Sequence, residues 1–158
     1  MWRYLWITAV VFISDQLTKY VAADYLLQHG EVKLAPFLNF VLVHNTGAAF
    51  GILSGAGGWQ NIFFISIALL ACAVILFLIR RLETKDILVV LGLMLILGGA
   101  AGNLTDRLIH GYVIDFIDVY YHNWHWPAFN IADSAITIGA VLLAVDALIL
   151  GSRHRQTS

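Results

Sequence analysis

The sequence has little charge and almost no cysteine. Of its 158 residues, 12% are charged and one, Cys72, is a cysteine. A single cysteine excludes a disulfide within the chain and a metal site built from several thiolates. The 9 Lys and Arg against 10 Asp and Glu include no basic run, so the chain lacks the electrostatic footprint of a nucleic-acid-binding protein.

Most residues of the chain are apolar. The chain is 60% hydrophobic, with a mean hydropathy of +0.81, which is more apolar surface than one soluble core of this size can bury. Four stretches are long enough to cross a bilayer at about 20 residues each: residues 5–26, 62–79, 87–105 and 131–150. The sequence therefore predicts an all-α membrane protein with four transmembrane helices in one domain, residues 1–158.

The basic residues predict the orientation of these helices. Arg3 precedes the first stretch, Arg80 and Arg81 follow the second, and Arg153 and Arg155 follow the fourth. By the positive-inside rule both termini are expected in the cytoplasm. The connections around residues 28–61 and 108–130 then lie outside.

These two outer connections have different compositions. Phe37–Val43 is apolar and rich in β-formers, which predicts a short sheet in the first. The second is rich in aromatic residues among polar ones, which predicts an interfacial helix or a flap.

Several polar residues fall within or beside the apolar stretches. At about 1.5 Å per residue counted from Asp86, Asp106 lies about 30 Å away, at the outer boundary of the membrane. The same counting places a set of residues from three helices and a loop near the outer face: Asp15, Asn103, Asp106, Arg107, Asp115 and Asp133. Carboxylates at membrane depth cost roughly 2.5 to 3.5 kcal/mol each, which favours one functional site.

The acidic residues nearest the predicted fourth helix also have structural interpretations. Asp133 follows Asn130 by three residues at a helix start, as a capping residue would. Asp115 and Asp118 are three residues apart, and spacing alone does not choose between a functional carboxylate and a solvated loop acid at either position.

The remaining polar groups have simpler interpretations as well. Asp15 and Lys19 are spaced i,i+4, and we favour mutual neutralisation within a helix. Asp106 and Arg107 suggest an interfacial ion pair. Gly98–Gly102 favours close helix packing over a ligand cradle.

The histidines offer one alternative site. His122 and His125 combined with Asp118 have the ligand chemistry of a zinc site, although their spacing is loose and we do not favour it. His44 is interpreted as a surface residue.

Five motifs, in order along the chain, resemble those of the lipoprotein signal peptidase family, also called signal peptidase II. They are Asp15-Gln-Leu-Thr-Lys19, Asn45-Thr-Gly-Ala-Ala-Phe50, Gly98-Gly-Ala-Ala-Gly-Asn-Leu-Thr-Asp-Arg107, Val113-Ile-Asp-Phe116 and Phe129-Asn-Ile-Ala-Asp133. The resemblance runs from the first helix to the last, with no departure at a position that carries the chemistry.

The resemblance implies an intramembrane aspartic endopeptidase. It places the catalytic pair on Asp115 and Asp133, and so favours Asp115 over Asp118. It further implies substrate binding by a set of polar residues, Asn45, Asn103, Arg107 and Asn130, and support of the site by Asp15, Lys19 and Asp106. No metal or other cofactor is expected.

The implied substrate is a prolipoprotein whose cysteine carries a diacylglyceryl group, cut on the amino side of that cysteine. The expected location is the bacterial inner membrane, with the site near its outer face, membrane lipid as a partner and a monomeric state. The alternative from the residues alone is a small proton- or ion-coupled transporter subunit, because intramembrane acids also serve proton relays.

Overall fold

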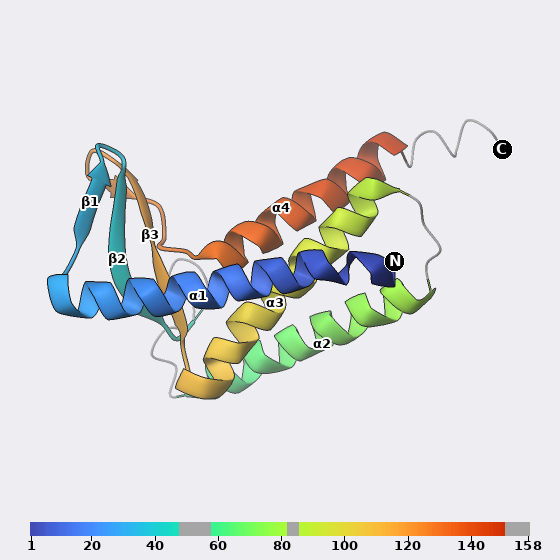
Figure 1. Ribbon diagram of the computed structural model, residues 1–158, viewed down its shortest axis with the longest axis horizontal. Helices are drawn as coiled ribbons and strands as arrows, with labels where there is room; N and C mark the ends of the chain where they lie inside the picture. Colours follow the sequence, from blue (N-terminus) through green and yellow to red (C-terminus); the bar gives the residue numbers. More distant parts are fainter. Residues whose placement is uncertain (48–57, 82–85, 151–158) are drawn as a thin grey trace.

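The structure, a computed structural model, describes residues 1–47, 58–81 and 86–150. A short 3₁₀ turn, Trp2–Tyr4, leads into helix α1, Leu5–His29. Helices α2, Trp59–Arg81, α3, Ile87–His110, and α4, Ile131–Val145, follow, and α4 continues as a π-helical segment, Asp146–Leu150. The four apolar stretches are therefore helical, as predicted (Figure 1).

Three of the helices extend beyond the predicted stretches at the ends nearer the two long connections. Helix α1 continues to His29, where Gly30 ends it with a φ of 74°, and α3 continues to His110, where Gly111 ends it with a φ of 83°. Helix α2 begins at Trp59 rather than at Ile62. The reason is that hydropathy marks the part of a helix that prefers lipid, whereas helical hydrogen bonding continues into polar turns.

By length and composition, three helices among the described residues are suited to crossing a membrane: Trp59–Arg81, Ile87–His110 and Ile131–Leu148. Helix α1 is not among them, since Asp15, Gln16 and Lys19 interrupt its apolar sequence. The helical character of the predicted fold is confirmed, whereas a fourth transmembrane helix stays a prediction.

The two predicted outer connections form one antiparallel sheet at one end of the helices (Figure 1). Its order is β1, Val32–Ala35, β2, Leu38–Asn45, β3, Val113–Tyr121, and β4, Trp124–His125. The sheet predicted around Phe37–Val43 is confirmed. Of the interfacial helix or flap predicted for the second connection, the helix is wrong, because Val113–Tyr121 pairs with β2 instead, and the flap stays a prediction.

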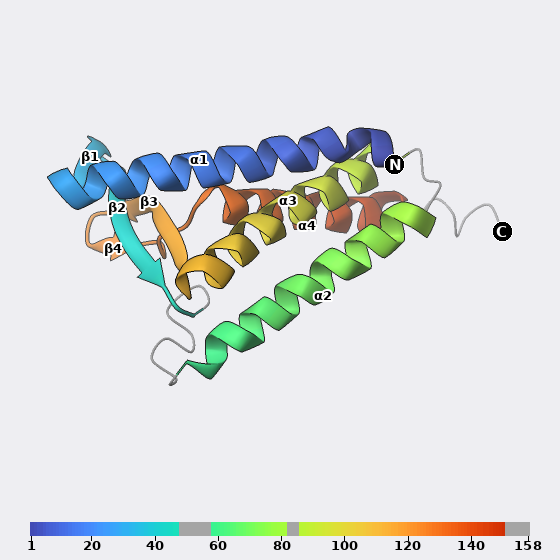
Figure 2. The same cartoon turned by 60° about the horizontal axis from the view of Figure 1, so that its bottom comes forward.

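Helix α3 lies at the centre of the helical part, in contact with α1, α2 and α4. Its glycines allow these close approaches: a Cβ at Gly98 would meet Thr8 and Val11 of α1, and one at Gly99 would meet Ala132 of α4. The packing role predicted for Gly98–Gly102 is confirmed. Helix α2 runs alongside α3 and diverges from α1 toward its Trp59 end (Figure 2).

Candidate active site

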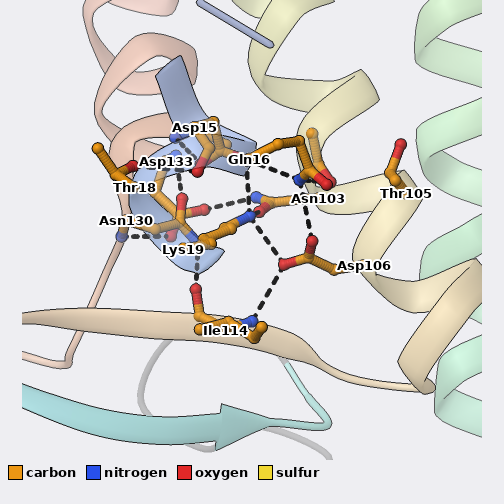
Figure 3. Close-up of polar contacts among 12 residues, drawn as sticks. Asp15, Gln16, Thr18, Lys19, Asn103, Thr105, Asp106, Ile114, Asn130 and Asp133 are labelled. Carbon is orange, nitrogen blue, oxygen red and sulfur yellow. Dashed lines mark hydrogen bonds and ion pairs between the residues drawn. The ribbon is translucent and has the colours of Figure 1, made fainter. Parts of the chain in front are cut away.

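The polar residues of the helices meet around Lys19. Its Nζ lies 2.8 Å from Asp15 Oδ2 and 2.9 Å from Asp106 Oδ2, and it donates a hydrogen bond of 2.9 Å to Asn103 Oδ1. Figure 3 shows these groups converging from α1 and α3. All four side chains are buried. The predicted pairing of Asp15 with Lys19 is confirmed, but Asp106 pairs with Lys19 and not, as suggested, with Arg107.

Both carboxylates of this cluster also hold backbone of the site. Asp15 Oδ1 accepts a hydrogen bond from the Ala132 amide at the start of α4, at 2.8 Å. Asp106 Oδ2 accepts one from the Ile114 amide at the start of β3, at 3.1 Å. The Lys19 cluster therefore ties the two elements that carry Asp133 and Asp115 to the helices.

Asn130 and Asn103 connect this cluster to the two candidate catalytic groups. The side-chain nitrogen Nδ2 of Asn130 donates to Asp115 Oδ1 at 2.7 Å and to Asn103 Oδ1 at 3.2 Å. Asn103 in turn donates to Asp133 Oδ1 at 2.8 Å. The two asparagines thus form a bridge between Asp115 and Asp133.

Asp133 also takes part in the helix cap that was the simpler interpretation of it. The Asn130 side chain accepts a hydrogen bond from the backbone N–H of Asp133. In return, Asp133 Oδ2 accepts one from the backbone N–H of Asn130 at 3.2 Å, and the two bonds form a capping box. Asp133 therefore caps α4 with one oxygen while its other oxygen accepts from Asn103.

Asp115 lies on β3 and is 1% exposed. Its Oδ2 accepts a hydrogen bond of 2.9 Å from Asn45 on β2. Burial, with a further contribution from the charge of Asp133, raises the pKa of Asp115 to about 7, although the hydrogen bonds from Asn45 and Asn130 and the charge of Lys19 act to lower it.

Arg107 occupies the neighbouring part of α3. Its Nη2 donates to the Gly47 carbonyl at 3.1 Å, and the guanidinium carbon lies 5.0 Å from the ring centre of Phe64. The Nε of Arg107 is buried and has no hydrogen-bond partner among the described residues. Of the motif that begins at Asn45, residues 48–50 lie outside the described residues.

A pocket of about 750 Å³ opens beside these groups. Asn45, Arg107 and Asp133 contribute polar atoms to its lining. The rest of the lining includes Phe64 of α2, residues 136–138 of α4 and the segment Trp126–Phe129. A pocket with a few polar groups and an otherwise mostly apolar lining suits an amphipathic ligand.

Asp118 lies apart from this network. It accepts a hydrogen bond of 3.2 Å from Asn39 and lies 2.9 Å from His125 Nδ1. The described residues hold no group of three His, Cys, Asp or Glu side chains suited to a metal ion. The zinc site considered for His122, His125 and Asp118 is therefore not formed. His44 is exposed, as predicted, and stacks on Tyr112.

The structure joins all nine predicted site residues through hydrogen bonds and ion pairs, and adds groups that the sequence interpretation missed. Gln16 donates to Asp106 at 3.0 Å and to Asp15 at 3.2 Å. Asn61 of α2 donates to the Arg107 carbonyl at 3.3 Å. Gln16 stands next to Asp15 in a quoted motif, whereas nothing in the sequence around Asn61 indicates a contact with α3.

Comparisons with known proteins agree on one family. Residues 7–149 match the family model described as signal peptidase (SPase) II. A lipoprotein signal peptidase of Alteromonas mediterranea is 50% identical over 154 residues, 98% of this chain and 85% of the relative. One of Acinetobacter baumannii is 47% identical over 155 residues, 98% of this chain and 88% of the relative.

A solved structure shows the same fold. It is described as a bacterial membrane enzyme determined by the in meso method at 2.3 Å resolution. It matches with a TM-score of 0.81 and 32% identity, covering 96% of this chain and 90% of that one.

Proposed function

The chain belongs to the signal peptidase II family, and we propose on that premise that it removes the signal peptide from prolipoproteins as an aspartic endopeptidase. The observation that carries the proposal is the bridge from Asp115 through Asn130 and Asn103 to Asp133 at the edge of the pocket. The transporter alternative has no support among the comparisons.

In the proposed reaction the two carboxyl groups share one proton. Two close carboxylates do not both ionise readily, and a pKa of about 7 lets Asp115 hold the proton near neutral pH. Asp133 takes a proton from water, whose oxygen forms a bond to the scissile carbonyl carbon. Asp115 donates its proton to the carbonyl oxygen. The carbon–nitrogen bond then breaks as the nitrogen receives the proton held by Asp133. Asp115 takes back a hydroxyl proton as the new carboxyl group forms, which returns the pair to its starting state.

Substrate binding is proposed for the remaining polar groups of the pocket. Arg107 lines the pocket, and its guanidinium is proposed to donate to a carbonyl of the substrate chain. Asn45, whose side-chain nitrogen donates to Asp115, also lines the pocket and is proposed to contact the substrate chain. Asn103 and Asn130 bind and orient the reacting groups, while Asp15, Lys19 and Asp106 support them.

The proposed substrate carries a diacylglyceryl group on its cysteine and is cut on the amino side of that cysteine. The apolar part of the pocket, with Phe64 and residues 136–138, suits a lipid chain or the end of a hydrophobic signal helix. Membrane lipid surrounds the protein, which we propose to be a monomer. No cofactor takes part in this reaction.

Helix α1 is proposed as the fourth transmembrane helix. Its 25 residues span about 37 Å at 1.5 Å each, longer than a hydrocarbon core of about 30 Å. Its polar Asp15 and Lys19 are buried against α3 and α4. The large side chains on its opposite face are apolar and exposed: Trp6, Val10, Ile13 and Leu17.

The proposed orientation places the sheet outside the bacterial inner membrane and both termini in the cytoplasm. Arg3 and Arg81 lie at the end of the helices away from the sheet (Figure 1). In a Cys72→Ala background, an impermeant thiol reagent added outside should label Glu31→Cys and spare Arg81→Cys. Labelling of Arg81→Cys without labelling of Glu31→Cys would indicate the opposite orientation.

The activity itself is tested with purified protein in liposomes and a prolipoprotein with or without its diacylglyceryl group. Cleavage is followed as a size shift, and the new amino terminus is sequenced. We expect cleavage of the lipidated form before the cysteine. Equal cleavage of the unmodified form would contradict the proposed specificity, and no cleavage of either form would contradict the activity.

A further inference from the structure

The segment Trp124–Phe129, which we call the pocket wall, is bonded to β3 through its backbone at Trp124–Trp126 and again at Phe129. Strand β4 is only Trp124–His125, too short to be stable by itself. Beyond it, the Trp126 amide donates to the Val119 carbonyl at 2.8 Å, and Phe129 pairs with Ile117. Pro127 between them has no amide hydrogen to donate. Figure 2 shows β4 lying against β3.

A side-chain contact fastens the start of this wall. His125 Nδ1 donates to the carboxylate of Asp118, 2.9 Å from each of its oxygens. The imidazole also stacks on Tyr120 with 5.3 Å between ring centres. Asp118 is 6% exposed and also accepts from Asn39 of β2. One contact therefore links β2, β3 and the pocket wall.

The wall leads directly into the site. Residues 126–129 line the pocket together with Asp133 and are followed immediately by Asn130, which bonds to Asp115. We propose that Asp118 and His125 are positioning residues for substrate binding, which hold the pocket wall at the distance from α4 that the substrate requires; this rests on the proposed function. Neither residue touches the reacting atoms.

The test separates positioning from chemistry by measuring kcat and KM for a lipidated prolipoprotein at equal amounts of membrane-inserted protein. His125→Ala should raise KM by about two- to fivefold with kcat near the wild-type value, because the His125 side chain is 54% exposed and solvent weakens its contact with Asp118 to about that factor in an equilibrium. Asp118→Leu should raise KM at least as much, because it also removes the acceptor of the Asn39 side chain. The variant with both changes should be no worse than Asp118→Leu, since the contact with His125 is already lost in that single variant.

Conservative variants distinguish a donor–acceptor contact from mere filling of space. His125→Asn places an amide N–H near the position of Nδ1, so its KM should lie closer to the wild-type value than that of His125→Ala. Asp118→Asn keeps an acceptor oxygen, so its KM should lie closer to the wild-type value than that of Asp118→Leu. His122→Asn is the matched control: it removes an exposed imidazole in the same turn, and asparagine tolerates the φ of 53° there. It should leave KM unchanged.

The outcomes are distinct. A wild type that fails to cleave contradicts the proposed function and this inference together, whereas normal cleavage with an unchanged KM in His125→Ala contradicts the inference alone. A loss confined to kcat, or a His125→Asn variant no better than His125→Ala, also overturns it. If His125→Ala fails to accumulate, His125→Asn is compared with His125→Gln, whose amide lies farther out; equal KM values contradict the inference.

Discussion

Replacing Lys19 by methionine should destabilise the protein strongly. Lys19 is 1% exposed and is the only cation in contact with Asp15 and Asp106 among the described residues. Methionine fills a similar volume but leaves two buried carboxylates without their partner. Removing one partner of a buried ion pair costs about 3–5 kcal/mol, and here two pairs share the lysine, so we expect a loss of at least about that size.

The assay is equilibrium unfolding of the purified protein in detergent micelles, followed by tryptophan fluorescence or circular dichroism. Lys33→Met is the matched control, because Lys33 is exposed on β1, and a surface change of this kind alters stability by about 0.5 kcal/mol or less. A variant that combines Lys19→Met with Asp15→Asn and Asp106→Asn should recover most of the loss, since asparagine oxygens still accept from the backbone amides.

Two results would refute this reasoning. If Lys19→Met unfolds with the same free energy as Lys33→Met, the buried network contributes nothing to stability. If the triple variant is less stable than Lys19→Met, the cost arises from the lost packing and hydrogen bonds and not from unpaired charge.

The other predictions concern the reaction and the helix packing. Asp115→Asn and Asp133→Asn should each lower turnover by a factor of about 10² to 10⁴, whereas Asp118→Asn should retain most of it; an active Asp133→Asn would leave only the capping role, which asparagine also fills. Because Asp115 acts in its protonated form, kcat/KM should fall as the pH rises through about 7. Asn45→Ala removes a hydrogen bond that lowers this pKa, so it should move the fall to higher pH. Gly102→Ala should cost about 1–3 kcal/mol in the same unfolding assay, because its Cβ would meet the fixed Asp15 carboxylate; an unchanged stability would show that this contact relaxes freely.

Part of this protein is determined by local sequence. The apolar stretches are helical where hydropathy placed them, because a chain in lipid must satisfy its own backbone hydrogen bonds. Leu38–Asn45 is a strand, since its apolar and β-branched residues suit a pleated surface. The i,i+4 spacing of Asp15 and Lys19 produces an ion pair for an equally local reason. The residues of the candidate site were named from the resemblance in their motifs.

Other features were decided only by the tertiary structure. Lys19 also reaches Asp106, and Asn45 reaches Asp115 across 70 positions of the chain, contacts that no local pattern encodes. Val113–Tyr121 is a strand and not an interfacial helix because β2 supplies the hydrogen-bonding partner that an aromatic segment alone lacks. Asp115 and Asp118 are equivalent acids in the sequence. They differ in the fold because β3 brings Asp115 to Asn45 and Asn130 while it brings Asp118 to Asn39 and His125.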